Sequence, residues 1–310
     1  MNAEPRTTVS QQILITGASG FAGSHLLDHL TRLGHDVVGW TRADVDLRDV
    51  DGVRAGIRRL RPSQIYHCAG APRVADSWQH TFETLENNVL TTHHLFDAVR
   101  RSGLTCRVLI PGSAMIYRGS NRAISEDDPL EPASPYGLSK LAQEQLGVRA
   151  SQEDGVEVVL TRSFNHVGPR QEPLFAAASM ARQLALIECG RAEPVIRVGN
   201  LDARRDLTDV RDTVRAYALL MAHGRPAAPY NVCSGVAYAM SEVLDGLRSR
   251  VPVDVRVETE ADRLRPNDAP LLVGNPARLR AETGWAPEIG FERMLDDLID
   301  YWRGVVRNGS

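Results

Sequence analysis

Tyr136 and Lys140 are the two residues of this chain whose types and spacing most directly suggest proton-transfer chemistry. Residues four positions apart share one face of a helix, so the Lys140 ammonium could lie beneath the Tyr136 phenol. A nearby positive charge favours the phenolate, and it would lower the pKa of Tyr136 from its ordinary value of about 10 towards neutrality. Such a tyrosine can donate or accept a proton at a reacting oxygen. Ser134 and Pro135 fit an N-cap followed by proline in the first turn, so they predict a helix that begins just before Tyr136.

A glycine-rich segment near the N-terminus gives this pair a context beyond that of an ordinary amphipathic surface helix. The segment Gly17-Ala18-Ser19-Gly20-Phe21-Ala22-Gly23 follows an apolar run and precedes a helical pattern. In that setting a glycine loop lets a pyrophosphate approach the backbone N–H groups of a helix N-terminus. A turn with three chance glycines is the weaker alternative. The sequence therefore predicts a bound dinucleotide, held by Gly17, Ser19, Gly20, Phe21 and Gly23.

The type of dinucleotide is indicated by the residues that follow the second apolar run. An NAD-selective site usually places an acidic side chain there, against the ribose hydroxyls of the adenosine. This chain has Thr41 and Arg42 instead. A guanidinium can pair with a 2′-phosphate, so NADP(H) is favoured and NAD(H) is the second candidate. Asp46 and Leu47 are expected at the adenine edge of the cofactor.

The third apolar run ends in His67-Cys68-Ala69-Gly70. Small residues here would allow a close approach of the nicotinamide, so Ala69 is expected at the cofactor. For His67 and Cys68 we prefer the simpler interpretation of an ordinary buried strand end.

Short apolar runs alternate with longer amphipathic stretches over most of the chain, and this alternation is typical of a doubly wound parallel sheet. The predicted strands are 13–15, 37–40, 64–67, 107–110, 156–161 and 230–233, and the predicted helices are 23–33, 47–60, 84–100, 135–150 and 210–221. The alternation loosens after about residue 165. We therefore predict an α/β protein with a Rossmann domain (11–165 plus 205–233) and an interleaved, smaller α/β substrate-binding lid (166–204 plus 234–306).

The bulk composition excludes several classes of function. The chain has 310 residues, 43% hydrophobic and 24% charged, with a formal net charge of −3, so nothing indicates binding to nucleic acid or to an anionic membrane. No apolar run approaches the roughly 18 residues that span a bilayer. The four cysteines are far apart without a Cys-x-x-Cys pair, which argues against a metal site or a disulfide framework and favours the cytoplasm.

Three segments in order, the glycine loop at 17–23, Ser113-Ala114-Met115-Ile116-Tyr117, and Tyr136-Gly137-Leu138-Ser139-Lys140, resemble the extended short-chain dehydrogenase/reductase family of nucleotide-sugar enzymes. The resemblance implies a catalytic triad of Ser113, Tyr136 and Lys140. Ser113 and Tyr136 would hydrogen-bond the reacting oxygen of the substrate. Tyr136 and Lys140 would also contact the cofactor, with Lys140 holding the nicotinamide ribose.

Further segments resemble the branch of GDP-mannose 4,6-dehydratases and GDP-4-keto-6-deoxymannose reductases. They are Asn165-His166-Val167-Gly168-Pro169-Arg170, the run 198–206, and Arg265-Pro266-Asn267-Asp268. By this resemblance Asn165, Arg205, Arg265 and Asp268 would hold a GDP-sugar, and His166 would touch the cofactor. An exposed ion pair is the alternative role for any one of the arginines.

One position separates the two reactions of that branch. Dehydratases of the family carry an acidic residue two positions before the tyrosine that here is Tyr117, and this position is Met115. Neither Met115 nor Ala114 can act as an acid or base. The sequence therefore predicts NADPH-dependent reduction of a 4-keto group, from GDP-4-dehydro-6-deoxy-D-mannose to GDP-D-rhamnose. The C4 epimer GDP-6-deoxy-D-talose stays open, as does a base other than guanine.

Two other functions remain alternatives at this point: a nucleotide-sugar 4-epimerase with tightly bound NAD, and a cofactor-sensing or scaffold protein without activity. The resemblance also implies a homodimer, because the segments 83–100 and 135–150 form a four-helix interface in relatives. Helices whose apolar faces are buried within their own domain would look the same.

Overall fold

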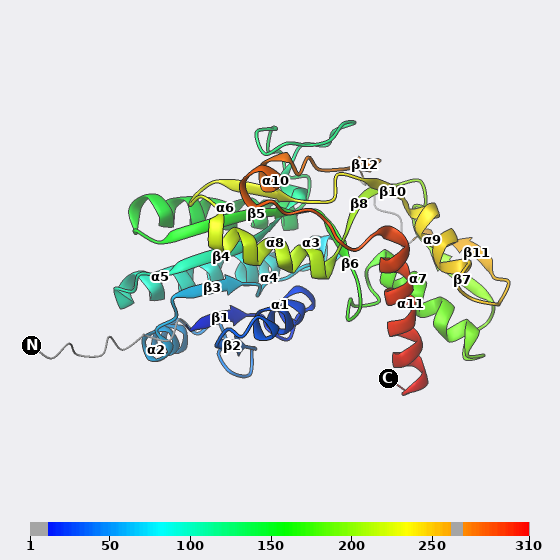
Figure 1. Cartoon of the computed structure of the whole chain (residues 1–310), viewed down its shortest axis with the longest axis horizontal. Coiled ribbons are helices and arrows are strands. Elements are labelled where there is room, and N and C mark those ends of the chain that lie inside the picture. Colours follow the sequence, from blue (N-terminus) through cyan, green and yellow to red (C-terminus); the bar gives the residue numbers. More distant parts are fainter. Residues whose placement is uncertain (1–11, 262–268, 310) are drawn as a thin grey trace, which may run out of the picture.

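The computed structural model describes residues 12–261 and 269–309 of the chain. Its central sheet has six strands: β1 (Ile13–Thr16), β2 (Val37–Trp40), β3 (Gln64–His67), β4 (Arg107–Ser113), β5 (Glu157–Ser163) and β9 (Pro229–Val232). All neighbours in this sheet are parallel, and the order is β2-β1-β3-β4-β5-β9 (Figure 1). Because β1 lies between β2 and β3, the strand order reverses beside β1, where doubly wound sheets bind their ligands. The predicted doubly wound Rossmann sheet is confirmed.

Helices cover both faces of this sheet, which is why its strands read as nearly continuous apolar runs. Successive residues of a strand point to opposite faces. Ile13 and Ile15 accordingly pack with the helices of one face, and Leu14 between them packs with those of the other. The first face carries α1 (Phe21–Arg32), α8 (Val210–His223) and α10 (Ala277–Thr283), and the second carries α2 (Val50–Leu60), α5 (Thr91–Ser102) and α6 (Pro135–Glu153).

The segment between β3 and β4 is an interrupted helix rather than the single helix 84–100 that the sequence predicts. It consists of α3 (Val74–Gln79), α4 (Thr81–Leu85), a π-helical turn η1 (Glu86–Leu90) and then α5. Single π turns inside helices occur frequently at functional sites. A short 3-10 helix, η2 (Ala114–Ile116), directly follows β4.

The part of the chain for which the sequence predicts a lid has its own sheets and its own core beside the central sheet (Figure 1). Its strands are β6 (Asn165–Val167), β7 (Val195–Val198), β8 (Arg204–Asp209), β10 (Ala237–Ala239), β11 (Arg256–Thr259) and β12 (Leu271–Leu272), and its helices are α7 (Ala176–Glu188), α9 (Met240–Arg248) and α11 (Phe291–Arg307). β8 pairs with β6, β10 and β12, and it therefore ties together three distant segments of the chain.

We propose to keep the division into 11–165 plus 205–233 and 166–204 plus 234–306, with two exceptions. β8 lies mostly within 205–233, yet it pairs with β6, β10 and β12 of the other unit. The second exception lies inside 234–306. Leu279 of α10 and Trp285 are buried in the core of the central sheet. The chain thus returns to the first unit after β12, before α11 completes the lid.

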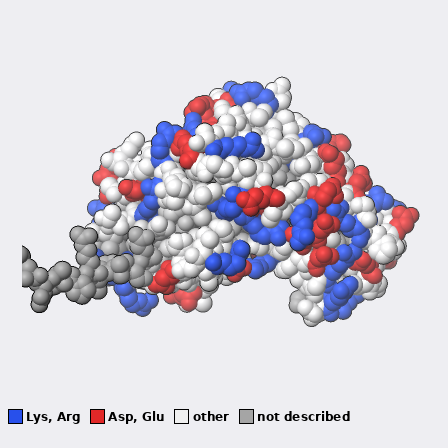
Figure 2. All heavy atoms as spheres, in the orientation of Figure 1, with Lys and Arg blue, Asp and Glu red and all other residues white. Residues whose placement is uncertain are grey.

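The face of the molecule in Figure 2 carries acidic and basic side chains interspersed, without a large area of one sign. Within the two described ranges no helix combines the length and the apolar character needed to cross a bilayer. The four cysteines are free, and the described residues contain no group of three side chains that could hold a metal ion.

Candidate active site

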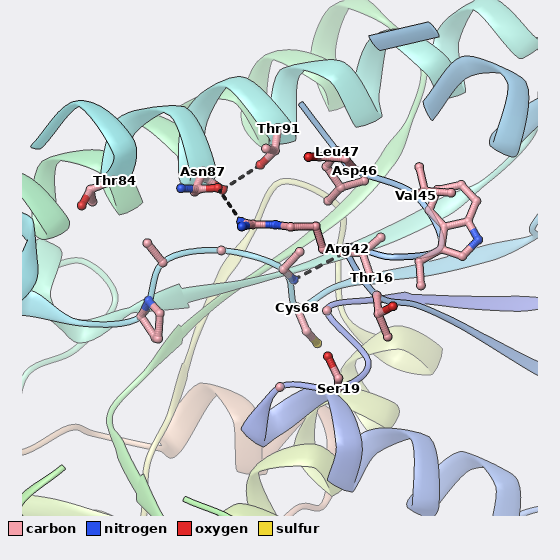
Figure 3. Close-up of a pocket in the computed structure, with 18 of the residues that line it drawn as sticks. Thr16, Ser19, Arg42, Val45, Asp46, Leu47, Cys68, Thr84, Asn87 and Thr91 are labelled. Atoms are coloured by element: carbon pink, nitrogen blue, oxygen red, sulfur yellow. Dashed lines mark hydrogen bonds between the residues drawn. The ribbon is translucent and has the colours of Figure 1, made fainter. Parts of the chain in front are cut away.

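A cavity of about 420 Å³ lies at the carboxyl ends of β1, β2 and β3 (Figure 3). Its walls come from the strand ends and from the interrupted helix between β3 and β4. The lining residues are Thr16, Gly17, Ser19, Gly20, Trp40, Thr41, Arg42, Val45, Asp46, Leu47, Cys68, Ala69, Gly70, Ala71, Pro72, Arg73, Asp76, Thr84, Asn87 and Thr91.

The glycine loop forms the wall of this cavity next to the N-terminus of α1. Gly17 has a φ of +69°, and a Cβ there would lie 2.7 Å from the backbone of Ala69, so only glycine fits. A Cβ on Gly23 would lie 2.1 Å from the Gly17 carbonyl oxygen, because the helix packs directly on the loop. Gly20, the N-cap, offers no side chain to the first N–H groups of α1, and the first turn has no acidic residue. These N–H groups and the helix dipole therefore fit a pyrophosphate.

Arg42 enters the cavity from the end of β2, as the sequence predicts. Its guanidinium donates to Oδ1 of Asn87 on η1 at 3.3 Å (Figure 3). Asp46, Leu47 and Ala69 also line the cavity. The Asp46 carboxylate forms an ion pair with Arg48, with 2.6 Å between Oδ2 and Nη2. The hydrogen bonds from Arg48 lower the pKa of Asp46 to about 2.

Ser113 and Tyr136 meet where β4 ends and α6 begins. Ser113 is the last residue of β4, and Tyr136 lies in the first turn of α6, behind the N-cap Ser134, whose Oγ accepts from the Gly137 N–H at 3.0 Å. The Tyr136 N–H donates to Oγ of Ser77 at 3.1 Å, which ties this turn to α3. Ser113 and Tyr136 are joined by a side-chain hydrogen bond, and both are buried.

The prediction of a lowered pKa for Tyr136 is wrong. Burial raises the pKa of Tyr136, because removing the phenol from water penalises the charged phenolate, and the hydrogen bond with Ser113 only opposes this effect. The charge of Lys140 does not outweigh this effect of burial, and the Lys140 ammonium is hydrogen-bonded to the Pro111 carbonyl oxygen and to Gln143. Tyr136 is therefore a protonated phenol at neutral pH, which suits it to give a proton rather than to take one.

Lys140 lies on the same helix but turns its ammonium towards β4. Its Nζ donates to the Pro111 carbonyl oxygen at 2.9 Å and to Oε1 of Gln143 at 2.8 Å. Burial lowers the pKa of Lys140 to about 8. None of the carboxylates in the described ranges forms an ion pair with Lys140.

Asn165 and Arg205, predicted to bind the substrate, and His166, predicted to touch the cofactor, lie on β6 and β8. Asn165 is exposed and stands opposite Leu207 in the register of these strands. The His166 ring stacks on Phe21 of α1, with ring centroids 5.6 Å apart, and burial lowers the pKa of His166. Neither Phe21 nor His166 lines the cavity, so their contact with a cofactor stays a prediction. Arg205 donates to the Ala269 carbonyl oxygen at 2.8 Å.

Two further substrate residues predicted from the sequence, Arg265 and Asp268, lie outside the described residues. Their assignment to the substrate stays a prediction. Ala269, where the described chain resumes, contacts Arg205.

Comparison with known proteins places this arrangement in a family. Residues 40–298 match the family model described as GDP-mannose 4,6 dehydratase. The chain belongs to this family. It is 33% identical over 306 residues to GDP-6-deoxy-D-mannose reductase of Pseudomonas aeruginosa, covering 96% of this chain and 99% of that protein. It is 27% identical over 320 residues to GDP-mannose 4,6 dehydratase 2 of Arabidopsis thaliana, covering 93% and 85%.

Solved structures extend the family likeness to the fold. RMD from Pseudomonas aeruginosa, complexed with NADPH, superposes with a TM-score of 0.88 at 31% identity, covering 95% of this chain and 99% of that one. UDP-glucose 4-epimerase of Thermus thermophilus, complexed with NAD, gives 0.83 at 27% identity, covering 94% and 99%. The chain is thus an NAD(P)-dependent oxidoreductase of this family, as the sequence predicts. RMD was solved with NADPH and this epimerase with NAD, which are the first and the second cofactor candidates that the sequence predicts.

Several lining residues of this family member were missed from the sequence: Arg73, the N-cap of α3, Asp76 on α3, and Thr84, Asn87 and Thr91 around η1. A signal for the last group was present. Asn87 and Asn88 stand together in a helical pattern, although asparagine is a poor helix former. In the structure Asn88 is fully buried, and its side chain donates to Oγ of Ser139 on α6 at 2.8 Å.

Lys140 carries a second signal that sequence reasoning overlooked. The chain has 36 lysines and arginines, and Lys140 is the only lysine among them. Every other basic side chain among these 36 is therefore an arginine. A lysine at this one position favours a role for which the compact ammonium differs from a planar guanidinium.

Proposed function

We propose that this protein reduces the 4-keto group of GDP-4-dehydro-6-deoxy-D-mannose with NADPH and forms GDP-D-rhamnose. The observation that carries the proposal is the buried, hydrogen-bonded pair of Ser113 and Tyr136, with a phenol that stays protonated at neutral pH. A ketone reduction needs a proton donor at the oxygen that becomes the hydroxyl.

Ser113, Tyr136 and Lys140 each have a separate role in the proposed reduction. A bound NADPH would supply the hydride. The Ser113 hydroxyl and the Tyr136 phenol donate hydrogen bonds to the ketone oxygen, where negative charge develops in the transition state. Tyr136 then gives its proton to that oxygen. The Lys140 ammonium lies one helical turn away, and its charge stabilises the tyrosinate that remains.

Met115 supports reduction over dehydration. It follows Ser113 by two residues in η2, and it packs against the apolar cluster that contains Ala114 and Phe164. Elimination of water from a sugar needs a group that takes a proton beside the ketone, and a thioether cannot do this. Among the described residues, no carboxylate acts on the pKa of Tyr136 either.

For the sugar nucleotide we propose Asn165 and Arg205 of the lid, together with Arg265 and Asp268. A guanidinium binds phosphate oxygens well through paired N–H donors. The likeness to GDP-6-deoxy-D-mannose reductase supports a guanosine diphosphate as the carrier. The face of C4 that receives the hydride decides between GDP-D-rhamnose and GDP-6-deoxy-D-talose.

The test is a reaction of the purified protein with NADPH and GDP-4-dehydro-6-deoxy-D-mannose, followed by the absorbance of the reduced nicotinamide. NMR of the isolated product assigns the configuration at C4, and we expect the D-rhamno product. Consumption of NADPH with a D-talo product would correct the stereochemistry alone. Interconversion of sugar nucleotides without added cofactor, by protein that carries stoichiometric NAD, would replace the proposal with a 4-epimerase. Absence of any turnover despite NADPH binding would favour a non-enzymatic role.

We also propose a homodimer that works in the cytoplasm. Four large apolar side chains are exposed on elements that pack against one another: Trp78 on α3, Phe82 on α4, Leu90 on η1 and Leu138 on α6. Phe82 is 73% exposed and Leu138 53%. An apolar surface built by these helices fits the four-helix interface that the sequence resemblance implies.

A further inference from the structure

A buried chain of hydrogen bonds leads from the Lys140 ammonium into the core beneath the cofactor cavity. Oε1 of Gln143, one turn along α6, accepts from Nζ of Lys140 at 2.8 Å. The other end of the same carboxamide donates to Oγ1 of Thr92 on α5 at 2.8 Å. Gln143 and Thr92 are both fully buried. The carboxamide is thus held at both ends, and its burial closes it off from solvent.

The chain continues through His67 to the start of the glycine loop. Nε2 of His67 lies 2.9 Å from Oγ1 of Thr92, and Nδ1 of His67 lies 2.8 Å from Oγ1 of Thr16. Thr16 is the last residue of β1, and it lines the cofactor cavity (Figure 3). This network of hydrogen bonds therefore runs through buried side chains of α6, α5, β3 and β1 and ends at the wall of the cavity.

The hydrogen-bond donors in this network can be assigned in only one way. The single hydroxyl proton of Thr92 goes to the Asn88 carbonyl oxygen at 2.7 Å, so its oxygen must accept from both Gln143 and His67. His67 then carries its proton on Nε2 and accepts at Nδ1 from the Thr16 hydroxyl. Burial, with a smaller contribution from the charge of Lys140, lowers the pKa of His67 to about 3, so the ring is neutral.

We propose that Gln143 is a positioning residue, which fixes the Lys140 ammonium through its Oε1 and is itself locked by Thr92 and His67. This inference rests on the proposed role of Lys140 in the reduction. Two of the three ammonium donors are used by Pro111 and Gln143, and the third is left for the cofactor or substrate. An amide does not relay protons readily, so the chain orients and stabilises the charge rather than conducting a proton.

Gln143 is the side chain whose hydrogen bond stabilises the Lys140 ammonium, and substitution can change it. The titratable groups whose charges interact with Lys140 are His67 and Cys68 from the β3 side. Tyr136 lies one turn earlier on the same helix. All three are neutral at pH 7, because burial holds the imidazole deprotonated and the thiol and phenol protonated. Acceptor dipoles, not counter-ions, therefore keep the ammonium charged.

Lys140 can be observed directly, because it is the only lysine of the chain. Protein labelled with ¹³C-lysine and carrying a lysine-free tag gives one lysine side-chain signal by NMR, and its pH titration reports Lys140 without any turnover. Gln143→Leu removes the acceptor, so we expect the midpoint to move down by about one pH unit, the scale of one charge-assisted hydrogen bond. Gln143→Glu supplies a carboxylate, so the midpoint should move up.

The matched control is Gln145→Leu, since Gln145 is exposed on the same helix two residues further on. Its lysine signal should titrate as in the wild type. If a Gln143 variant does not fold, Thr92→Val removes the lock on Gln143 with little change in shape, and it should give a smaller downward shift. Unchanged midpoints in both Gln143 variants would overturn the proposal, and so would shifts in the same direction.

The pH profile of kcat separates positioning from a structural role. Its alkaline limb should move with the lysine signal, down in Gln143→Leu and up in Gln143→Glu, whereas a merely structural defect lowers kcat at every pH. If the lysine signal shifts as expected but no keto sugar is reduced, the positioning of Lys140 stands and the proposed reaction fails.

Discussion

Arg162 on β5 and Glu144 on α6 form a buried, bidentate ion pair, in which Nε and Nη2 of Arg162 lie 2.9 and 2.7 Å from the two carboxylate oxygens. The side chains are 5% and 6% exposed. Arg162 also donates to the Tyr117 hydroxyl and to the Glu126 carbonyl oxygen. The pair connects α6, the helix that carries Tyr136 and Lys140, to β5, so it helps to position these two side chains, which we propose to be catalytic.

Breaking this pair should destabilise the fold. Glu144→Ala leaves the Arg162 charge buried without a counter-ion, and we expect the free energy of unfolding to fall by about 3–5 kcal/mol in urea titrations. Glu144→Gln keeps an acceptor and should cost less. The control is Glu153→Ala, which removes an exposed pair with Arg149 at 3.4 Å and should change stability by less than about 0.5 kcal/mol. Equal effects of Glu144→Ala and Glu153→Ala would show that the buried pair does not anchor α6.

Tyr136→Phe tests the proton donor. The substitution keeps the ring but removes the hydroxyl, so kcat should fall by about 10²–10⁴ while NADPH binding changes little. Steady-state kinetics and a fluorescence titration of NADPH measure the two effects. Tyr301→Phe, on α11 of the lid, is the control. A kcat within threefold of the wild type would assign the proton to another group.

The buried charge of Lys140 predicts a pH dependence of stability. Burial lowers its pKa to about 8, whereas an exposed lysine in the unfolded chain titrates at about 10.4. Between these values the unfolded chain binds more protons, so the contribution of Lys140 to the free energy of unfolding rises with pH. The wild type should therefore gain stability relative to Lys140→Met as the pH rises from about 8 to about 10. Parallel calorimetric curves over this range would contradict the buried charge.

Arg42→Ala tests the choice of cofactor. If the guanidinium binds the 2′-phosphate, its loss should weaken NADPH binding by about ten- to a hundredfold, the worth of a charge-assisted hydrogen bond, and NADH binding far less. Fluorescence titrations with both cofactors give the ratio. Arg58→Ala, an exposed arginine of α2 outside the cavity, should leave both affinities unchanged. An equal loss for the two cofactors would remove Arg42 from the 2′-phosphate.

Phe82→Asp together with Leu138→Asp tests the proposed dimer. Charges placed in an apolar interface are costly to bury, so the double variant should be monomeric in light scattering after size exclusion, while the wild type is a dimer. Leu33→Asp is the matched control, because Leu33 is 59% exposed and lies at the end of α1 instead. A dimer that persists in the double variant would place the interface elsewhere.

Much of the fold and part of the site could be predicted from the sequence, because local patterns encode them. The apolar runs of β1 to β5 and β9 and the N-cap at Ser134 depend on neighbours within a few residues. The prediction failed where the answer depends on burial and on distant partners. The pKa of Tyr136 is raised because the folded chain removes the phenol from water, and spacing along the helix carries no information on this.

The sequence by itself determined the glycine loop, the Ser113, Tyr136 and Lys140 side chains and the absence of an acid at position 115, since these are matters of residue type and order. Only the tertiary structure decided that Asn87 meets Arg42 and that Gln143 meets Lys140 within one buried network. Hydrogen bonds act over about 3 Å, and folding alone brings such groups within that distance.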